Sequence, residues 1–205
     1  AGVRSLTFVA PALLVSTAVM TAAGEMTYPV MSGFKWQRIY YGPLASPISP
    51  GQIAFGHLLA VSFRFIAQAT VFWGLMQLFG ASASGWSWLV IPIGVLSALS
   101  FASLLQAYAA TLRDEGFQFA FIQRFIVMPM FLFAGTFFEL TAMPVYLRWI
   151  GWLSPVWHGT ELARVANYGR ELAPGMAWVH VGYLLALLAL GLVLANRNYR
   201  RRLAE

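Results

Sequence analysis

The sequence has no cysteine and few charged residues. Without cysteine, disulfides, thiol chemistry and Cys-based metal sites are excluded. Charged residues make up 10% of the 205 residues, against about 25% in ordinary soluble domains. Hydrophobic residues make up 60%, and so high a share excludes a disordered chain. The few charged residues are not enough to cover the surface of a soluble domain. The composition therefore predicts a chain that lies in a lipid bilayer.

The sequence has a single lysine, and the residue that follows it excludes one function. The phosphate-binding loop G-x-x-x-x-G-K-[ST] needs a lysine before Ser or Thr, but the single lysine, Lys35, precedes Trp36. No H-E-x-x-H zinc motif is present, and His57, His158 and His180 fall in different predicted elements. No set of acid, base and nucleophile converges either. We therefore expect no catalytic residue, metal site or cofactor in this chain.

Long uncharged runs predict an all-α polytopic membrane protein with a single transmembrane domain, residues 1–205. The uncharged run between Arg64 and Arg113 is more than twice as long as one span needs, so residues 80–85 are expected to turn it into a hairpin. The predicted spans are residues 5–24, 53–79, 86–112, 117–138 and 174–195. The predicted connections are a loop at 25–52, an outer segment at 139–173 with short re-entrant or interfacial helices, and a tail at 196–205.

Basic residues predict the orientation, because cytoplasmic loops carry an excess of Lys and Arg. A cytoplasmic tail puts seven basic residues inside: Lys35, Arg38, Arg113, Arg197, Arg200, Arg201 and Arg202. The outside then holds Arg4, Arg148, Arg164 and Arg170. The C-terminus is therefore predicted to be cytoplasmic and residue 1 to lie outside. No signal peptide is recognisable before the first span, and a chain that begins outside without one is unusual. We therefore expect that at least one preceding span is absent from this sequence.

Two arginines are predicted to lie inside spans, where a charge costs about 2.5–3.5 kcal/mol. Arg64 falls near the middle of its span, and Arg124 lies about seven residues from the inner end of another. Glu25, at the inner end of the first span, is the nearest candidate counter-ion for either. The pair can hold helices together, contact a polar substrate headgroup or take part in gating, and the sequence leaves these roles open.

Four stretches together resemble one transporter family over nearly the whole chain. They are FVAPALLVSTAVMTAAGEMTYPVM (residues 8–31), FKWQRIYYGPLASPISPGQIAFG (34–56), PMFLFAGTFFEL (129–140) and PVWHGTEL (155–162). In this order they are similar to the membrane subunits of ABC-2 type exporters, in the branch of nodulation-factor, polysaccharide and drug-efflux exporters. Such permeases have six spans, so the first span here corresponds to the family's second.

The resemblance implies partners and an energy source outside this chain. Two permease chains, as a homodimer, would pair around a pathway, and two separate ATPase subunits would bind ATP and Mg. A short cytoplasmic helix over residues 34–41 would couple them. Its contact residues would be Phe34, Lys35, Trp36, Arg38, Tyr40 and Tyr41. The same residues could instead form an aromatic and basic anchor at the membrane interface.

The resemblance also implies an outer gate and a pathway wall. The gate candidates are Phe137, Phe138, Glu139, Trp149, Trp157, His158 and Glu161. The wall candidates are Met20, Phe125, Met128, Met130, Phe131 and Phe133. Two simpler interpretations stay open: Glu161 and Arg164 can form a surface pair that stabilises a short exposed helix, and Met and aromatic stripes can be plain helix packing.

The leading functional prediction is the permease subunit of an ATP-driven exporter in the bacterial plasma (inner) membrane, moving a drug, lipid or lipid-linked saccharide. One alternative is an ATP-independent secondary transporter or channel that uses Arg64 and Arg124. A membrane-embedded enzyme is a third possibility, disfavoured by the missing catalytic set. The net charge of +6 is concentrated beside an apolar span, so we expect a lipid bilayer as partner and no nucleic acid.

Overall fold

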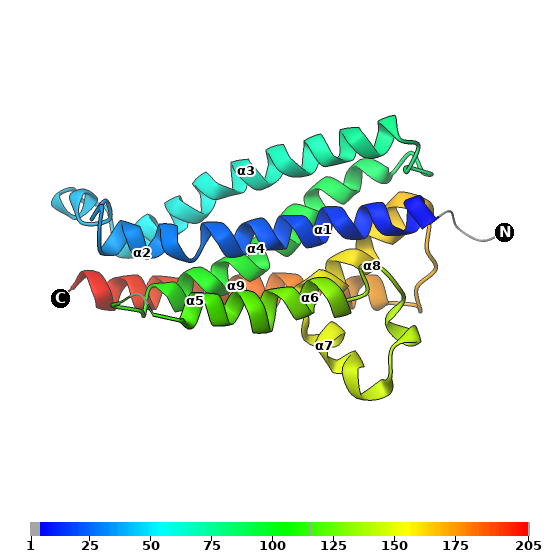
Figure 1. Ribbon diagram of the computed structural model, residues 1–205. Coiled ribbons are helices and arrows are strands. Elements are labelled where there is room, and N and C mark those ends of the chain that lie inside the picture. The colour runs from blue at the N-terminus through cyan, green and yellow to red at the C-terminus, as the bar shows by residue number, and fades with distance from the viewer. Residues whose placement is uncertain (1–4, 115, 205) are drawn as a thin grey trace.

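The computed structural model describes residues 5–114 and 116–204, and every regular element in these ranges is a helix (Figure 1). Within them, four stretches are long and apolar enough to cross a membrane. They are Ser5–Phe34, Pro50–Leu78, Ser87–Ala109 and Met176–Leu203. The predicted all-α polytopic membrane fold is confirmed.

The bundle is organised around one central helix, α4 (Val90–Ala109). It packs against α1 (Ser5–Glu25), α3 (Pro50–Leu78), α8 (Pro155–Tyr168) and α9 (Met176–Leu203). Small residues at the contacts let the backbones approach closely, as is usual between helices in membranes. A Cβ on Gly159 of α8 would collide with Ser97 of α4, and one on Gly191 of α9 would collide with Ser103.

The first span is longer than the predicted residues 5–24. Helix α2 (Tyr28–Phe34) continues the direction of α1 after a short break, and the two together form a single apolar stretch. Pro29 lacks an N–H, and its ring would clash with the carbonyl four residues earlier, which explains the break after Glu25. Helix α1 does end at Glu25, as the sequence indicated, but the apolar stretch continues through α2 to Phe34.

The predicted coupling helix over residues 34–41 was also wrong. Helix α2 ends at Phe34, and residues 35–41 form turns before the short 3-10 helix η1 (Gly42–Ala45). Arg38 has a φ of 55°, a left-handed conformation that a right-handed helix does not admit. The segment before η1 is therefore a compact turn.

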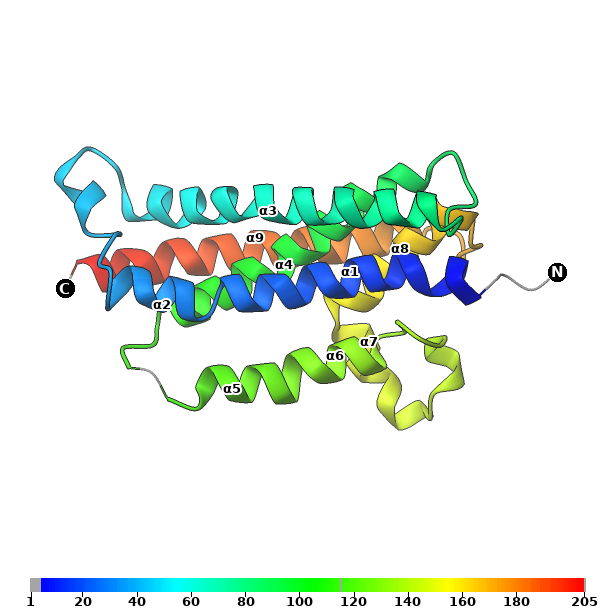
Figure 2. The same ribbon diagram turned by 45° about the horizontal axis from the view of Figure 1, so that its top comes forward.

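The predicted span at 117–138 is shorter and broken. It consists of α5 (Gln118–Ile122), the π-helical turn η3 (Gln123–Val127) and α6 (Met128–Phe133). Pro129 cannot donate a backbone hydrogen bond, and the wider π turn before it accommodates this gap. Gly135, with a φ of 83°, follows the end of α6. Figure 2 shows α5 and α6 lying along the outside of the bundle.

The outer segment contains four helices. They are η4 (Leu140–Ala142), η5 (Val145–Leu147), α7 (Arg148–Leu153) and α8. Helix α7 presents Trp149 and Trp152 to the surroundings, both more than half exposed. Helix α8, in contrast, is inserted between α1, α4 and α9 and is mostly buried. The interpretation of Glu161 and Arg164 as a pair on an exposed helix was therefore wrong.

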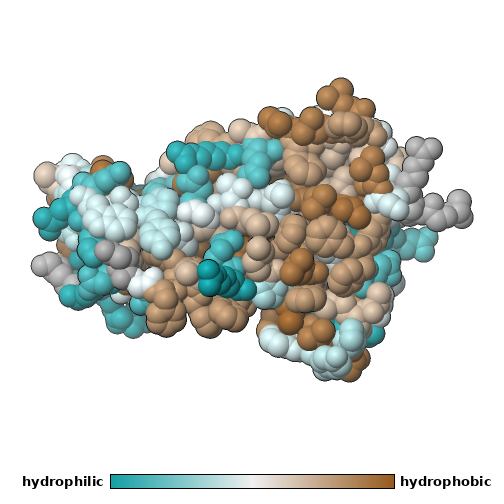
Figure 3. Space-filling view, viewed as in Figure 1, coloured by the Kyte–Doolittle hydropathy of each residue, from teal (hydrophilic) through white to brown (hydrophobic). Residues whose placement is uncertain are grey.

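The two ends of the bundle differ in charge. One end, here called the basic end, contains residues 35–49, 110–114 and 196–204, and the C-terminus lies there (Figure 1). The opposite end, called the α8 end, contains the α3–α4 connection, α7 and α8. Figure 3 shows hydrophilic residues gathered at the basic end and a largely hydrophobic surface over the middle of the helices.

Candidate functional site

An ion pair lies at membrane depth. Arg64, at the midpoint of α3, directs Nη1 to both carboxylate oxygens of Glu25, at 2.7 and 2.8 Å. Glu25 is thus the counter-ion of Arg64. The Arg64 side chain is nevertheless 67% exposed, against 22% for Glu25. A neutralised but exposed pair in a span marks a face that does not simply contact lipid tails.

A second charge lies on the same side of the molecule. Arg124 is exposed in the π-helical turn η3, and π turns inside helices frequently occur at functional sites. Figure 3 shows two hydrophilic patches interrupting the hydrophobic surface, one over α3 and one over η3, with α1 between them. Glu25 contacts Arg64, and no ion pair of Arg124 is found within the described ranges.

The candidate pathway residues divide into two groups. Phe125 and Met128 are exposed, by 64% and 46%, on the broken helix that carries Arg124. Phe131 is partly buried and stacks edge-on against Phe137, with ring centroids 5.4 Å apart. Met20 is partly buried against the core of the bundle. Met130 is buried, and Phe133 is half-buried.

Helix α8 carries a buried guanidinium, Arg164, at the centre of a polar network. Arg164 donates to Glu161 (3.3 Å), to the Phe8 carbonyl (3.3 Å) and to the Gly135 carbonyl (2.7 Å). The guanidinium also lies 3.7 Å from the centre of the Phe8 ring. Arg164 is completely buried, so this network joins α8 to the start of α1 and to the segment after α6.

The network continues to the surface through Arg170. Its Nε lies 3.0 Å from Glu161, and its Nη1 lies 3.1 Å from Glu139. Burial on its own would lower the pKa of Arg170, but Glu161, Tyr168 and Glu139 outweigh that effect, and the pKa is raised. Arg170 therefore stays charged and links α8 to the segment that begins at Glu139.

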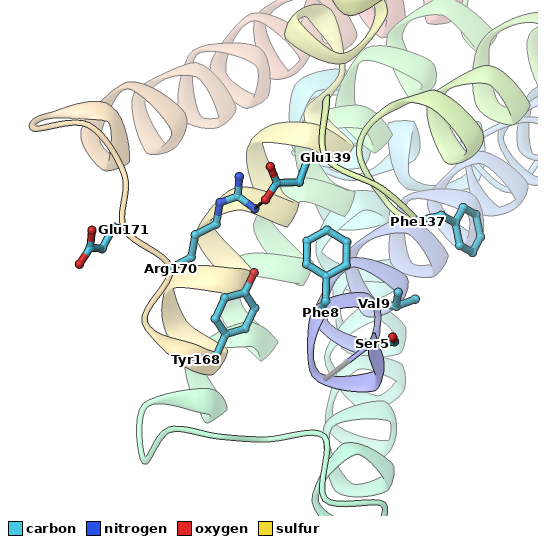
Figure 4. A pocket seen from close by; sticks show the side chains of 8 residues that line it. All are labelled: Ser5, Phe8, Val9, Phe137, Glu139, Tyr168, Arg170 and Glu171. Atoms are coloured by element: carbon cyan, nitrogen blue, oxygen red, sulfur yellow. Dashed lines mark ion pairs between the residues drawn. The ribbon is translucent and has the colours of Figure 1, made fainter. Parts of the chain in front are cut away.

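A cavity of about 590 Å³ opens beside this network at the α8 end (Figure 4). Its lining residues are Ser5, Phe8, Val9, Phe137, Glu139, Tyr168, Arg170 and Glu171. Figure 4 shows the Arg170–Glu139 pair joining two segments of its wall, with the Phe8 and Tyr168 rings nearby. The combination of apolar rings and paired charges suits an amphipathic molecule better than a purely apolar one.

Two histidines that the sequence places in different elements, His158 and His180, contact each other inside the bundle. His158 of α8 and His180 of α9 face each other with Nδ1 atoms 2.8 Å apart, and His158 Nε2 lies 3.0 Å from the Trp152 carbonyl. Trp157 packs edge-on against both rings. Spacing could not reveal this contact, because it depends on how α8 enters the bundle.

The gate candidates are therefore only partly together. Phe137 and Glu139 line the cavity, and Glu161 pairs with Arg170 beneath it. Trp157 and His158 lie deeper, against α9. Phe138 is 39% exposed and Trp149 is 55% exposed, and neither lines the cavity. The sequence reasoning missed Arg170 as the link between these groups, although its position among acidic residues was a usable signal.

The candidate coupling residues also divide. Phe34 and Tyr40 are buried against Tyr199 of α9, and Tyr40 Oη lies 3.0 Å from His57 Nδ1. Burial raises the pKa of the Tyr40 hydroxyl. These two rings contribute to this chain's own core, so they are not available to a partner in this arrangement.

The other coupling candidates remain near the surface of the basic end. Trp36 is 50% exposed, and Arg38 is exposed above the ring of Tyr41, 5.2 Å from its centre. Lys35 pairs with Asp114 at 3.0 Å. The exposed part of this segment is therefore centred on Trp36 and Arg38.

The helices and their buried charges define a polytopic α-helical membrane protein. The model of the ABC-2 type transporter family matches residues 2–168, and the chain belongs to that family. It is the membrane subunit of an ABC transporter, an integral protein of the inner membrane that associates with an ABC ATPase partner.

Several relatives match nearly the whole chain. Nodulation protein J of Rhizobium leguminosarum bv. viciae is 23% identical over 206 residues, covering 98% of this chain and 77% of that protein. Nodulation protein J of Bradyrhizobium diazoefficiens is 26% identical, covering 98% and 76%. The probable multidrug ABC transporter permease YbhR of Escherichia coli (strain K12) is 26% identical, covering 95% of this chain and 52% of that protein.

Proposed function

We propose that this chain forms the translocation pathway of an ATP-driven exporter for an amphipathic substrate, such as a drug, lipid or lipid-linked saccharide. Family membership supports transport. The relatives include a protein described as a multidrug permease and others described as nodulation proteins, so their names support no single substrate. ATP and Mg are assigned to the partner ATPase, because Lys35 does not occur in a phosphate-binding loop.

The observation that carries the proposal is the charged face of the bundle. Arg64, which pairs with Glu25 of α1, is exposed on α3, and Arg124 is exposed on η3; α1 contacts both of these elements. Charges in spans usually face a water-filled cavity or another helix, since exposure to lipid tails is costly. We assign this face to the substrate pathway, with Phe125 and Met128 as its adaptable apolar wall.

A second copy of this chain would complete the pathway. Two copies that face each other through the side with Arg64 and Arg124 would enclose these charges, and a C2 homodimer is the simplest such arrangement. Two ATPase subunits would then dock at the two basic ends. The excess of basic residues at these ends supports a cytoplasmic C-terminus.

The docking region is assigned to the turn at residues 35–49. Trp36, Ile39 and Ile48 are between 44% and 54% exposed there, next to the cation of Arg38. Exposed aromatic and basic side chains are frequent anchors in protein interfaces. This assignment replaces the predicted coupling helix with a turn, in which Phe34 and Tyr40 connect the turn to α9 from inside.

The outer gate is assigned to α8 and the segment after α6. Arg170 connects both through Glu161 and Glu139, and the cavity lies beside them. Movement of α6 would pull on Glu139 and on the Gly135 carbonyl that Arg164 holds. We infer that these contacts keep the outer side closed when no substrate is present.

The natural absence of cysteine allows a direct test with single-cysteine variants. Phe125→Cys and Met128→Cys should cross-link to a second copy in membranes, and ATP with the ATPase partner should change their reaction with a maleimide. Val193→Cys, 65% exposed on α9, is the matched control and should do neither. ATP-independent labelling and absence of cross-links at positions 125 and 128 would contradict the proposed pathway.

A further inference from the structure

Two adjoining cavities at the basic end are lined by cations. One, of about 430 Å³, is lined by Phe34, Lys35, Arg38, Tyr41, Arg113 and Arg202. The other, of about 190 Å³, is lined by Ala110, Thr111, Arg113, Asn198, Arg201 and Arg202. Arg113 and Arg202 belong to both, so the cavities are neighbours. Among the described residues that line them, none is acidic.

Arg202, which lines both cavities, is held in place by the chain itself. Arg202 donates to the carbonyls of Ala109, Ala110 and Leu112 at the end of α4, and it lies 4.2 Å from the centre of the Phe34 ring. A guanidinium has five N–H donors in a planar fork, so these contacts orient the group that borders both cavities.

Arg38 is positioned by an unusual backbone. Its φ of 55° is rare for a residue with a large side chain. Strained conformations of this kind occur mainly at functional sites, where the surrounding structure enforces them. Here the conformation places the guanidinium over Tyr41, at the rim of the larger cavity.

An apolar groove of about 350 Å³ begins one helical turn away. Helix α4 contributes Phe101, Leu104, Leu105 and Tyr108, and the broken helix contributes Phe121, Ile122 and Ile126. Residues 101, 104 and 108 share one face of α4 by their spacing, and Thr111 lies in the turn that follows Ala109, the last residue of α4. Thr111 lines the smaller basic cavity and donates to the Tyr108 carbonyl at 2.6 Å. The apolar groove therefore leads along α4 to the cations.

We propose that the smaller basic cavity and the apolar groove together form a binding site for an anionic phospholipid, beside the larger cavity that borders the turn assigned to the ATPase. The phosphate would lie among Arg113, Arg201 and Arg202, and an acyl chain would occupy the groove beside Ile126. Basic cavities between membrane helices are known to suit acidic lipid headgroups. A soluble ATPase could contact the cations, but it could not fill a groove that extends along the membrane-embedded part of α4. The continuity of cations and groove therefore favours a lipid.

The test is native mass spectrometry of the detergent-purified chain, titrated with dioleoyl phosphatidylglycerol or dioleoyl phosphatidylcholine. The anionic lipid should bind several-fold more tightly. Arg113→Gln and Arg201→Gln should each weaken its binding about five-fold, the effect of one cation near a membrane surface. The control, Arg200→Gln, removes one positive charge from α9, the helix that also carries Arg201. It should change nothing, because Arg200 contacts Asn196 outside both cavities.

The groove is tested separately by Ile126→Trp, which fills it. This variant should weaken binding of both dioleoyl lipids and leave binding of inorganic phosphate unchanged. Equal binding of the two lipids, or an equal loss in Arg200→Gln, would overturn the proposal. Full displacement of the anionic lipid by inorganic phosphate would assign the cavities to a free anion. Loss of the ATPase partner in Arg113→Gln with unchanged lipid binding would assign them to a protein interface.

Discussion

His158 Nδ1 and His180 Nδ1 lie 2.8 Å apart and join α8 to α9. The Trp152 carbonyl can only accept, so His158 Nε2 carries a proton and donates to it at 3.0 Å. His158 Nδ1 is then the acceptor in the neutral ring, and His180 Nδ1 is the donor. The geometry thus assigns one tautomer to each ring and makes the contact directional.

This direction predicts different effects for two substitutions of His180. His180→Leu leaves the buried His158 Nδ1 without a donor, which should cost about 1–3 kcal/mol of unfolding free energy. His180→Asn places an amide N–H near the position of Nδ1 and should recover at least half of that loss. Denaturant titration in detergent micelles measures both. Equal stability of the two variants would show that the hydrogen bond contributes little.

Substitution of Arg164 is expected to lower the free energy of unfolding more than substitution of His180. Arg164→Met removes four hydrogen-bond contacts, including the one to the Gly135 carbonyl in the segment after α6. Loss of one member of a buried ion pair typically costs about 3–5 kcal/mol. Arg164→Lys keeps the charge but not the planar fork, so its loss of unfolding free energy should be smaller than that of Arg164→Met. The exposed Arg197→Met is the control, and a comparable loss there in the same denaturant titration would refute this role.

Composition and hydropathy were sufficient to predict the fold class. An uncharged run of about twenty residues has few alternatives to a membrane helix. Charges are so scarce that Glu25 was the nearest candidate counter-ion for Arg64 or Arg124, and the structure pairs it with Arg64. Helix α8 was harder to place from sequence. Glu161 and Arg164 look like surface residues until the contacts of Arg164 with Phe8 and Gly135 are known. Those partners are distant in sequence, so no local pattern indicates them.

The pair of Glu25 and Arg64 predicts a non-additive effect on transport. Glu25→Gln leaves the guanidinium of Arg64 without its counter-ion at membrane depth, and Arg64→Gln leaves a lone carboxylate. Each single variant should lower ATP-dependent transport about ten-fold or more, since an uncompensated charge there costs about 2.5–3.5 kcal/mol. The double variant should transport better than either single one. The measurement is dye efflux from vesicles that also contain the ATPase. Additive losses would instead indicate that each side chain acts alone.

Trp36 is expected to contribute most of the ATPase contact. It is half exposed at the basic end, and truncation of such an aromatic anchor typically costs about 2 kcal/mol, or a roughly thirty-fold weaker affinity. Trp36→Ala should therefore weaken retention of the ATPase during co-purification. Trp178→Ala is the matched control, because Trp178 is 80% exposed at the start of α9, at the opposite end. Equal retention in both variants would move the docking surface elsewhere.

Gly159 determines how closely α8 can enter the bundle. A Cβ at this position would collide with Ser97 Oγ of α4 and would lie 2.8 Å from Val15 Cγ1 of α1. Rotation of the Ser97 hydroxyl would leave Ser97 Cβ at 3.0 Å and Val15 Cγ1 in the way, so Gly159→Ala should push α8 outward and strain the contacts of Arg164, at a cost of about 1–3 kcal/mol. Gly182→Ala in α9 meets nothing within 4 Å and should be neutral or slightly stabilising. Thermal unfolding in detergent compares the two.

If α8 is the outer gate, Gly159→Ala should also raise maleimide labelling of a cysteine placed at Phe137, whereas Gly182→Ala should not. Unchanged labelling alongside lower stability would mean that α8 supports the fold without closing the cavity.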